Sequence, residues 1–550
     1  MSERRLWGWL GPDHADPLAS APKAERWLAQ LFGLEKLTPT PPVELDTAGV
    51  TPSRLDGGMR VALEKALPSG SVSYDPADRA AASLGQSYPD QLQRRAGRVA
   101  RPVDGLAMPA SHDEAQALLD AAARTGFRVS VSGGATSVTG ALDVQSGKPV
   151  VACSMLKMNR VLAISQTNHV LTAGPGAFLP DIETALAQKG LTLGHFPQSF
   201  HGATLGGSIA ANGAGQRSDL YGRIADNLVS VRMATPSGEW RSEPFRHAAA
   251  GPWLGGLAAG SEGLFGIITE ATVRLHERRS QIKDIAWMAP DFGAAMEAAR
   301  HIAQSEARIA MVRISDAAET GFLGGFRLAR AGRSRPAFVE RAVLALKRAP
   351  ANPCLVIIGM ESNHGHSDVD FAVIRRAMKM AGAVLLGEGP GRSWQKSRFE
   401  APHLREALMA RGLGVDTYET AANWSALPAL HVAVTRALQD AAGKTGVKAA
   451  VFCHLSHSYA DGACLYFTAA FPRAADEHGQ WLTLKKAATD AILANGGALS
   501  HHHGMGADHA PWAKQANGEK SLSVLASLAR SFDPQGIMAT GLRTALPNGG

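Results

Sequence analysis

The spacing of hydrophobic and polar residues divides the chain into two parts, and the first part alternates helices with short strands. In residues 109–126, PASHDEAQALLDAAARTG, apolar side chains recur at helical spacing. Ser111 is placed to cap this helix with Glu114 three residues on, and Gly126 predicts its end. Strand-like patterns occupy residues 127–133, 149–155, 169–176, 228–240 (a hairpin turning at Ser237-Gly238) and 266–275.

Past about residue 278 the pattern changes to longer amphipathic helices with fewer strands between them. Helices are predicted over 291–304, 370–382 and 482–497, and strands over 310–316 and 354–360. A hairpin is predicted from 448–459 to 463–471. Its second strand alternates so that Tyr466 shares a face with Cys464 and Thr468.

This pattern predicts an α+β protein with two major units. We expect a helical, irregular lead-in over residues 1–90, a first unit over 91–277 and a second over 278–510. The last segment, 511–550, contains the sequence FDPQGIMATG, which is interpreted as a short segment that packs against another part of the protein. We therefore expect the segment 511–550 to return to the first unit. A chain of 550 residues is too long for one simple core, which agrees with this division.

Composition narrows the class of protein. The chain is 45% hydrophobic and 19% charged, as in ordinary soluble globular proteins. No uncharged apolar run is long enough to cross a bilayer, and the first residues lack a signal-peptide apolar stretch. The four cysteines have no metal-type CxxC spacing, so a reduced cytoplasmic location is expected.

The net charge of +7 suits an anionic membrane surface or a phosphorylated substrate, and it is equally compatible with an incidental property of the surface. The basic residues are scattered without interleaved aromatic residues, which argues against nucleic acid as a partner. Peripheral membrane contact and a homodimer both stay open.

Three glycine-rich segments are the strongest chemical signal in the first part. SGGATS (132–137) follows a predicted strand, where its backbone N–H groups could hold a pyrophosphate or simply make a tight turn. A much longer run, 194–222, and a third segment, 260–273, suit backbone lying against a large flat cofactor. No GxGxxG motif for a Rossmann-type NAD site is present.

In this order, SGGATS, TLGGSIAANGAG and GSEGLFGIITEATVRL resemble the FAD-binding domain of vanillyl-alcohol-oxidase-type flavoproteins. The resemblance implies a two-subdomain FAD-binding domain over 91–277 and an α+β cap domain that covers the flavin. Ala135 and Thr136 stand where some members tether the flavin through histidine or cysteine, so non-covalent FAD is implied. The implied cofactor-binding residues are Ser132, Gly133, Gly134, Ala135, Thr136, Ser137, Gln198, Ser199, Thr204, Gly206, Gly207, Ser208, Asn212, Gly213, Glu262, Gly263, Gly266, Ile267 and Ile268.

The second part narrows the resemblance. LWGW near the start, CHLSHSYADGACLYFTAAF, ILANGGALSHHHGMG and FDPQGI are similar, in order, to the alkyl-dihydroxyacetone-phosphate synthase family of ether-lipid synthesis. The resemblance implies proton transfer by Tyr466 with His501, His502 and His503. It also implies that Arg313 and Arg405 lie near the head group of the substrate.

The implied reaction exchanges the acyl chain of an acyl-dihydroxyacetone phosphate for a fatty alcohol. A base removes a proton beside the carbonyl, flavin N5 attacks that carbon, and the flavin returns without net redox change. A free tyrosine has a pKa of about 10, so Tyr466 needs nearby cations to act as a base. The histidine run and the arginines could supply them. Arginine also suits phosphate because its planar fork can bond two oxygens.

One departure keeps a second function open. Where the synthases read cysteine-arginine before the hairpin turn, this chain has Cys453-His454, so His454 is a candidate substrate-binding residue. FAD-linked D-2-hydroxyacid dehydrogenases place metal-binding histidines in this hairpin. However, Tyr466 replaces the second ligand and His502 the acid, so we predict no metal site. A third alternative, a flavin-bearing protein without catalysis, is disfavoured by the convergence of these groups.

Overall fold

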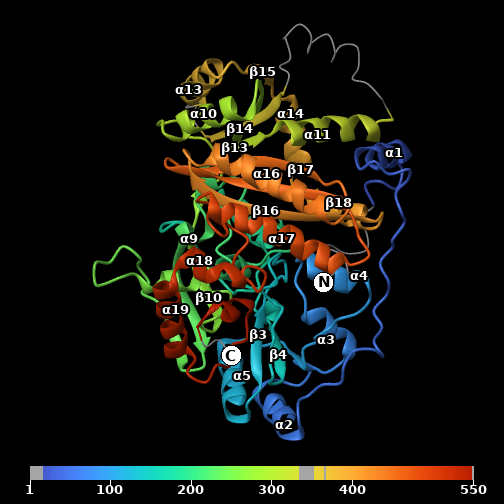
Figure 1. Cartoon of the computed structure of the whole chain (residues 1–550). Coiled ribbons are helices and arrows are strands. Elements are labelled where there is room, and N and C mark those ends of the chain that lie inside the picture. Colours follow the sequence, from blue (N-terminus) through green and yellow to red (C-terminus); the bar gives the residue numbers. More distant parts are fainter. Residues whose placement is uncertain (1–15, 333–351, 364–366, 548–550) are drawn as a thin grey trace.

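The computed structural model describes residues 16–332, 352–363 and 367–547. The LWGW stretch at 6–9 lies outside the described residues. Helices of the lead-in run along one side of the molecule (Figure 1). They are α1 (Pro22–Leu31), α2 (Gly57–Ala66), α3 (Pro76–Ala82) and α4 (Tyr88–Arg95).

A four-stranded sheet forms the first part of the half that is expected to bind FAD (residues 91–277), called the FAD-binding half below. Its strand order is β1 (Val72–Ser73), β2 (Gly105–Ala107), β4 (Val150–Ser154) and β3 (Arg128–Ser132). Helix α5 (His112–Thr125) packs its apolar face against this sheet. Its capping is as predicted, because the Ser111 side chain accepts from the Glu114 N–H and Gly126 ends the helix with a φ of 94°.

The end of the chain contacts this sheet. Val129 of β3 donates its N–H to the Ile537 carbonyl at 2.9 Å and accepts from the Ala539 N–H at 2.8 Å. Met538, between them, is buried in the same core. Two helices precede this segment, α18 (Ala513–Asn517) and α19 (Glu519–Phe532).

The second sheet of this half is antiparallel and carries two of the glycine-rich segments at its ends. Its order is β5 (Val161–Ser165), β6 (Val170–Ala173), β10 (Ile267–Arg274), β8 (Leu228–Thr235) and β9 (Gly238–Arg241). A two-strand pair joins β7 (Leu191–Thr192) to β11 (His276–Glu277). The connecting helices are α6 (Leu179–Ala187), α7 (Leu205–Ala210), α8 (Ser218–Tyr221) and α9 (Ile224–Asn227).

The cap is built on a seven-stranded antiparallel sheet, and its strands over 281–289, 384–387 and 413–423 were not predicted from the sequence. The order is β15 (Val384–Gly387), β12 (Gln281–Ala289), β14 (Cys354–Ser362), β13 (Met311–Ser315), β17 (Ala450–Ser458), β18 (Gly462–Pro472) and β16 (Leu413–Asn423). The hairpin of β17 and β18 is confirmed. In Figure 1 this sheet lies above the two sheets of the FAD-binding half.

The two faces of the cap sheet are covered differently. On one face, the largest hydrophobic core packs under α10 (Phe292–Ala303), α13 (Ser367–Met380), α16 (Leu427–Lys444) and α17 (Glu477–Ala494). The other face borders a cavity, together with α11 (Ala317–Arg330), α14 (Gly389–Ser397) and α15 (Ala401–Met409). Strand alternation therefore sends half of the side chains of β17 and β18 toward this cavity.

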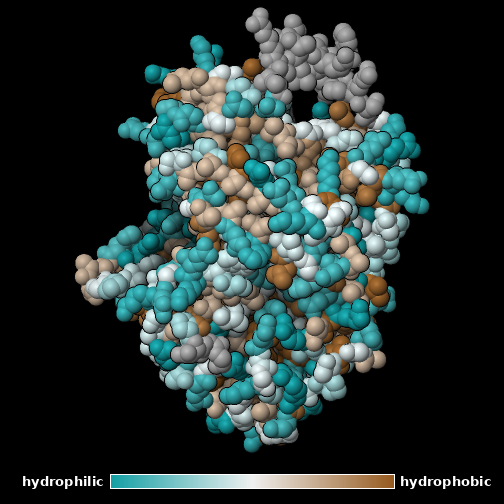
Figure 2. All heavy atoms as spheres, in the orientation of Figure 1, coloured by the Kyte–Doolittle hydropathy of each residue, from teal (hydrophilic) through white to brown (hydrophobic). Residues whose placement is uncertain are grey.

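A buried ion-pair network holds the two halves together. Arg217, just before α8, bonds both carboxylate oxygens of Asp284 on β12, at 2.7 and 2.9 Å. Asp219 accepts from the Val312 N–H and from the Ser458 hydroxyl of the cap sheet. On the outer surface seen in Figure 2, hydrophobic side chains are scattered among hydrophilic ones. In the part of the chain described, no helix has the length and apolarity needed to cross a membrane.

Candidate active site

A large cavity of about 1830 Å³ lies between the cap sheet and the glycine-rich segments. It brings together most of the residues predicted from the sequence, although they come from four distant parts of the chain. Its walls include Ser132, Gly133, Gly134, Ala135, Thr136, Ser137, Gln198, Ser199, Thr204, Gly206, Gly207, Ser208, Gly213, Glu262, Gly263, Gly266, Ile268, Arg313, Arg405, His454, Tyr466, His502 and His503.

Three predicted residues do not line the cavity. Ile267 is fully buried in the core under α5, because alternation along β10 turns it away from Ile268. Asn212 lies beside the cavity with a φ of 50°, and its side-chain oxygen has no hydrogen-bond partner. His501 lies behind His502, where its Nε2 is 2.7 Å from the Tyr459 hydroxyl.

The loop at 132–137 has the features of a phosphate cradle. Ala135 adopts a φ of 52°, a conformation that non-glycine residues rarely take and that recurs at functional sites. In the described part of the chain, the N–H groups of Ala135, Thr136 and Ser137 donate to no other group. Unpaired N–H groups on a cavity wall fit an anionic ligand such as the pyrophosphate of FAD.

The glycines of this region serve the packing of two loops against each other. A Cβ on Gly134 would lie 1.8 Å from the Gly202 carbonyl oxygen, and one on Gly206 would lie 2.4 Å from Pro175. A Cβ on Gly207 would lie 3.1 Å from the Thr204 hydroxyl oxygen, and one on Gly263 would meet only Val131 at 3.8 Å, although the φ of 82° at Gly263 still favours glycine. The glycine-rich pattern therefore reflects close contact between backbones as much as contact with a ligand.

His195 is a cavity residue that the sequence reasoning missed. It is 1% exposed, and neither of its ring nitrogens has a hydrogen-bond partner in the described structure. Burial lowers the pKa of His195 to about 4, so its ring is neutral. Buried polar atoms are almost always paired, so these nitrogens fit a cofactor that supplies the missing partner.

Glu262 faces the loop after the histidine run. Its carboxylate accepts from the N–H groups of Met505 at 2.6 Å and Gly506 at 2.9 Å. Burial raises the pKa of Glu262 to about 7, and the two backbone N–H groups oppose that rise only in part. The third glycine-rich segment is thus tied directly to the loop that carries the histidines.

Three side chains stand in a row across adjacent strands on the cavity side of the cap sheet. Tyr466 on β18 lies opposite His454 on β17 and opposite Glu419 on β16. The rings of Tyr466 and His454 are stacked, with centroids 4.9 Å apart and an interplanar angle of 17°. Tyr466 also faces the rings of His502 at 5.9 Å and His503 at 5.4 Å. The predicted partners of Tyr466 therefore meet around its ring.

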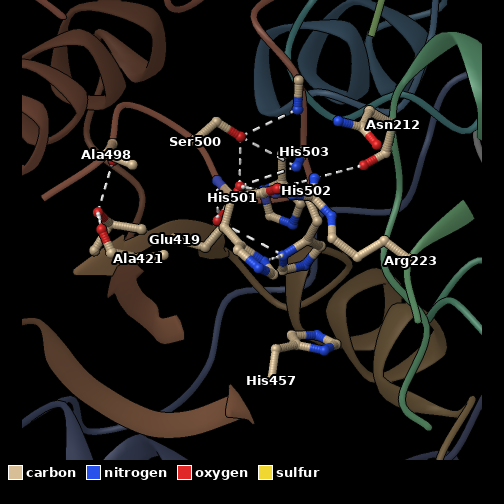
Figure 3. Close-up of polar contacts among 12 residues, drawn as sticks. Asn212, Arg223, Glu419, Ala421, His457, Ala498, Ser500, His501, His502 and His503 are labelled. Atoms are coloured by element: carbon tan, nitrogen blue, oxygen red, sulfur yellow. Dashed lines mark hydrogen bonds and ion pairs between the residues drawn. The ribbon is translucent and has the colours of Figure 1, made fainter. Parts of the chain in front are cut away.

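Glu419 holds the histidine loop in place, and the sequence reasoning missed it. Its carboxylate accepts from the Ser500 hydroxyl at 2.6 Å and from the N–H groups of His501, His502 and His503 at 2.7, 3.1 and 2.9 Å. Figure 3 shows Glu419 under this loop, with the rings of His501 and His502 turned toward each other. Four donors on one buried carboxylate fix the backbone of the loop.

Burial favours the uncharged form of all three histidines of the run. Burial lowers the pKa of His501 to about 3, the pKa of His502 well below its usual value, and the pKa of His503 below it too. The negative charge of Glu419 opposes each shift without overcoming it. At neutral pH these rings are therefore uncharged.

Tyr466 differs from the expectation that cations favour its phenolate. Burial raises the pKa of Tyr466 to about 12; a hydrogen bond with Thr417 opposes the rise, and the charge of Glu419 adds to it. Because the neighbouring histidines are neutral, they supply no positive field. The hydroxyl of Tyr466 therefore keeps its proton at neutral pH.

The predicted head-group arginines are both engaged within the protein. Arg313 pairs with Glu319 at 2.9 Å, and the same carboxylate lies 3.1 Å from His454 Nδ1. Burial alone would raise the pKa of Glu319, but Arg313 and His454 hold it at about 2. Arg405 donates to the Val415 and Gln86 carbonyls, and its Nη2 has no hydrogen-bond partner.

One group of side chains has the donor types of a metal site. Glu419, Cys464, His501 and His502 offer ligand atoms that all lie within 4.8 Å of one another. However, the Glu419 oxygens already accept four hydrogen bonds, and His501 Nδ1 lies 3.0 Å from His502 Nδ1, as in a hydrogen-bonded pair. The cluster is therefore satisfied by its own hydrogen bonds.

Comparison with known proteins agrees with this geometry. Residues 103–242 match the family model "FAD binding domain", and residues 280–542 match "FAD linked oxidases, C-terminal domain". The chain is 30% identical to alkyldihydroxyacetonephosphate synthase of Trypanosoma brucei brucei over 496 residues, 87% of this chain and 79% of the relative. It is 29% identical to the synthase of Dictyostelium discoideum over 506 residues, 91% of this chain and 83% of the relative.

A solved alkyldihydroxyacetonephosphate synthase structure superimposes with a TM-score of 0.79 and 27% identity, covering 96% of this chain and 92% of that one. The predicted α+β architecture and the FAD-binding domain are thereby confirmed. The chain belongs to the FAD-binding flavoproteins of the vanillyl-alcohol-oxidase type, in the branch of alkyldihydroxyacetonephosphate synthase.

Proposed function

We propose that this protein exchanges the acyl chain of an acyl-dihydroxyacetone phosphate for a fatty alcohol, using non-covalently bound FAD. The observation that carries the proposal is the arrangement of Tyr466 between His454 and His502 on the cavity wall. Related proteins over most of the chain are named for this synthase activity. Bound FAD supplies an electrophilic flavin ring that ends the cycle in its starting redox state.

The residues divide the proton transfers between them. His502 and His503 are neutral and line the cavity, so either ring can take the proton beside the substrate carbonyl. Tyr466 keeps its proton at neutral pH and can donate it to the departing carboxylate oxygen, after which its phenolate can take the proton that the incoming alcohol loses. His501 acts on this pair only through His502 Nδ1, at 3.0 Å.

The cavity also has a region suited to a long alkyl chain. Away from Tyr466, its wall is formed by aromatic and aliphatic side chains of α11, α15 and the cap sheet, and this cluster packs against α1. These side chains are Phe322, Phe326, Leu408, Val415, Phe452 and Ala470. Apolar walls favour the transfer of methylene groups from water. We extend the proposal to substrates that carry lipid chains.

The first loop supports non-covalent binding of FAD. Residues 132–137 contain no histidine or cysteine, so this loop offers no nucleophile for a covalent bond to the flavin. Its free N–H groups and the unpaired ring of His195 instead fit a dinucleotide held by hydrogen bonds. Denaturation should therefore release all of the FAD into the supernatant.

A second candidate, oxidation of a D-2-hydroxyacid, is favoured by one observation. Glu319 pairs with both Arg313 and His454. Its negative charge offsets positive charge on this part of the cavity wall, which makes the wall less suited to a doubly charged phosphate. A small carboxylate substrate needs only one cation, such as Arg405.

The deciding experiment gives the purified holoprotein either palmitoyl-dihydroxyacetone phosphate with hexadecanol or a panel of D-2-hydroxyacids. We expect alkyl exchange without an electron acceptor, and a flavin spectrum that is oxidised again at the end. Stable flavin reduction by a hydroxyacid, with no exchange, would replace the first candidate by the second.

A further inference from the structure

Arg398 is a cavity residue that neither the sequence reasoning nor the proposed reaction assigns. It follows α14 directly and lines the cavity from the cap side. Its guanidinium carbon lies 4.6 Å from the centroid of the Phe399 ring and 5.0 Å from that of Phe196. In the described residues, its guanidinium forms neither a hydrogen bond nor an ion pair with a carboxylate.

Two carboxylates near Arg398 already form ion pairs with another arginine. Asp284 and Glu361 both pair with Arg217, at 2.7 and 3.3 Å. Burial and the charge of Arg217 lower the pKa of Arg398 to about 10, which still leaves it charged at neutral pH. A half-buried cation with only aromatic contacts keeps its hydrogen-bonding donors for a ligand.

The position of Arg398 is fixed from the FAD-binding half. Its carbonyl oxygen accepts from Gln198 Nε2 at 2.8 Å and from Gln216 Nε2 at 2.9 Å. Both glutamines belong to the glycine-rich segment 194–222 and line the cavity. These two hydrogen bonds fix the backbone of Arg398 at the junction of the two halves. Its side chain therefore extends into the cavity from a defined backbone position.

We propose that Arg398 is the anion-binding residue that receives the phosphate of the substrate, a role for which Arg313 is already neutralised. This inference rests on the proposed function. A guanidinium can bond two phosphate oxygens at once, and the surrounding rings shield the pair from water. The same chemistry could serve the pyrophosphate of FAD, so the test must separate the two anions.

The test measures binding rather than turnover. Dihydroxyacetone phosphate and uncharged dihydroxyacetone are titrated into the holoprotein and followed by the flavin spectrum and calorimetry, for Arg398→Gln and Arg398→Lys. Loss of a charged hydrogen-bonded pair predicts about 10- to 100-fold weaker binding of dihydroxyacetone phosphate by Arg398→Gln, with a smaller loss for Arg398→Lys. The affinity for FAD should not change.

Arg392→Gln is the matched control. It removes the same charge from α14, the helix that precedes Arg398, but Arg392 is exposed, pairs with Glu388 and does not line the cavity. Its affinity for dihydroxyacetone phosphate should equal that of the unaltered protein.

Three results would overturn the proposal: no binding of dihydroxyacetone phosphate by the unaltered holoprotein, equal binding by Arg398→Gln, or a loss confined to FAD affinity. Phosphate-dependent binding that requires Arg398, in a protein that performs no alkyl exchange, would support the anion site and refute the proposed reaction instead.

Discussion

Glu419 lies directly opposite Tyr466 in the antiparallel pairing of β16 with β18. This register places a buried carboxylate beside the proposed proton donor, and the same carboxylate accepts the backbone N–H groups of His501, His502 and His503. One strand position thus sets where the histidine loop stands relative to the tyrosine. Glu419 is a positioning residue, because it acts through the loop.

Replacement of Glu419 by glutamine should lower kcat by about 10- to 100-fold, since an amide NH2 would face backbone N–H groups that need acceptors. The pH profile separates this role from a purely structural one. Because the charge of Glu419 raises the pKa of His502, its removal should move the acid limb of the profile to lower pH. Measurement of kcat from the lowest pH at which the protein stays folded up to pH 8, at full FAD occupancy, checks this.

Glu297→Gln, on the exposed surface of α10, is the control for loss of one carboxylate. An acid limb that stays in place in Glu419→Gln, with kcat reduced, would mean that the residue only supports the fold.

Tyr466→Phe should retain FAD and lose about 10²- to 10⁴-fold in turnover, because the ring contacts survive while the proton donor is removed. The ring stacks on His454 with or without the hydroxyl, so stability should change little. FAD content, the melting temperature and the rate of alkyl exchange are measured on the same sample. Tyr459→Phe is a comparison outside the cavity wall, and it should affect the rate less. Unaltered rates in Tyr466→Phe would contradict the assignment.

Local patterns in the sequence predict the first half of the fold and much of the site. The capped helix α5, the hairpin of β17 and β18, and the side of β18 on which Tyr466 lies all follow from short-range spacing. Strand β16 was missed because it is buried yet polar: Asp416, Glu419 and Thr420 interrupt the apolar alternation that marks a strand.

What the sequence hides are contacts between distant segments. Glu419 meets the histidine loop more than 80 residues later in the chain, and Arg398 meets Gln198 from 200 residues away. No local spacing encodes such pairs. The charge state of the histidines near Tyr466 is hidden for a related reason: burial in the assembled cavity lowers the pKa of His502 and of His503, and no local spacing encodes that burial.

His501 should make the protein sensitive to mild acid. Burial lowers its pKa to about 3 in the folded chain, while an unfolded histidine has a pKa of about 6.5. Below pH 6.5 the unfolded chain binds a proton that the folded chain does not, so stability falls as the pH drops toward 3. Between pH 7 and pH 5 this one residue should cost about 2 kcal/mol of unfolding free energy.

Urea unfolding at pH 7 and pH 5 tests this on the unaltered protein and on His501→Gln. The variant should lose about 2 kcal/mol less between the two pH values. His247→Gln, at an exposed histidine, should behave like the unaltered protein. Equal losses in all three proteins would show that His501 does not titrate on unfolding.

Removal of metal ions should leave the exchange reaction unchanged. Glu419, Cys464, His501 and His502 have metal-binding donor types, but the Glu419 carboxylate is saturated by four hydrogen bonds from Ser500–His503. A metal ion at this site would have to displace donors that a buried carboxylate needs, at a cost of about 1–3 kcal/mol for each group left unpaired. Dialysis against a chelator, followed by elemental analysis and rate measurement, is the test. A stoichiometric zinc or manganese ion whose removal abolishes activity would show that the histidine loop serves metal-dependent oxidation rather than proton transfer beside the flavin.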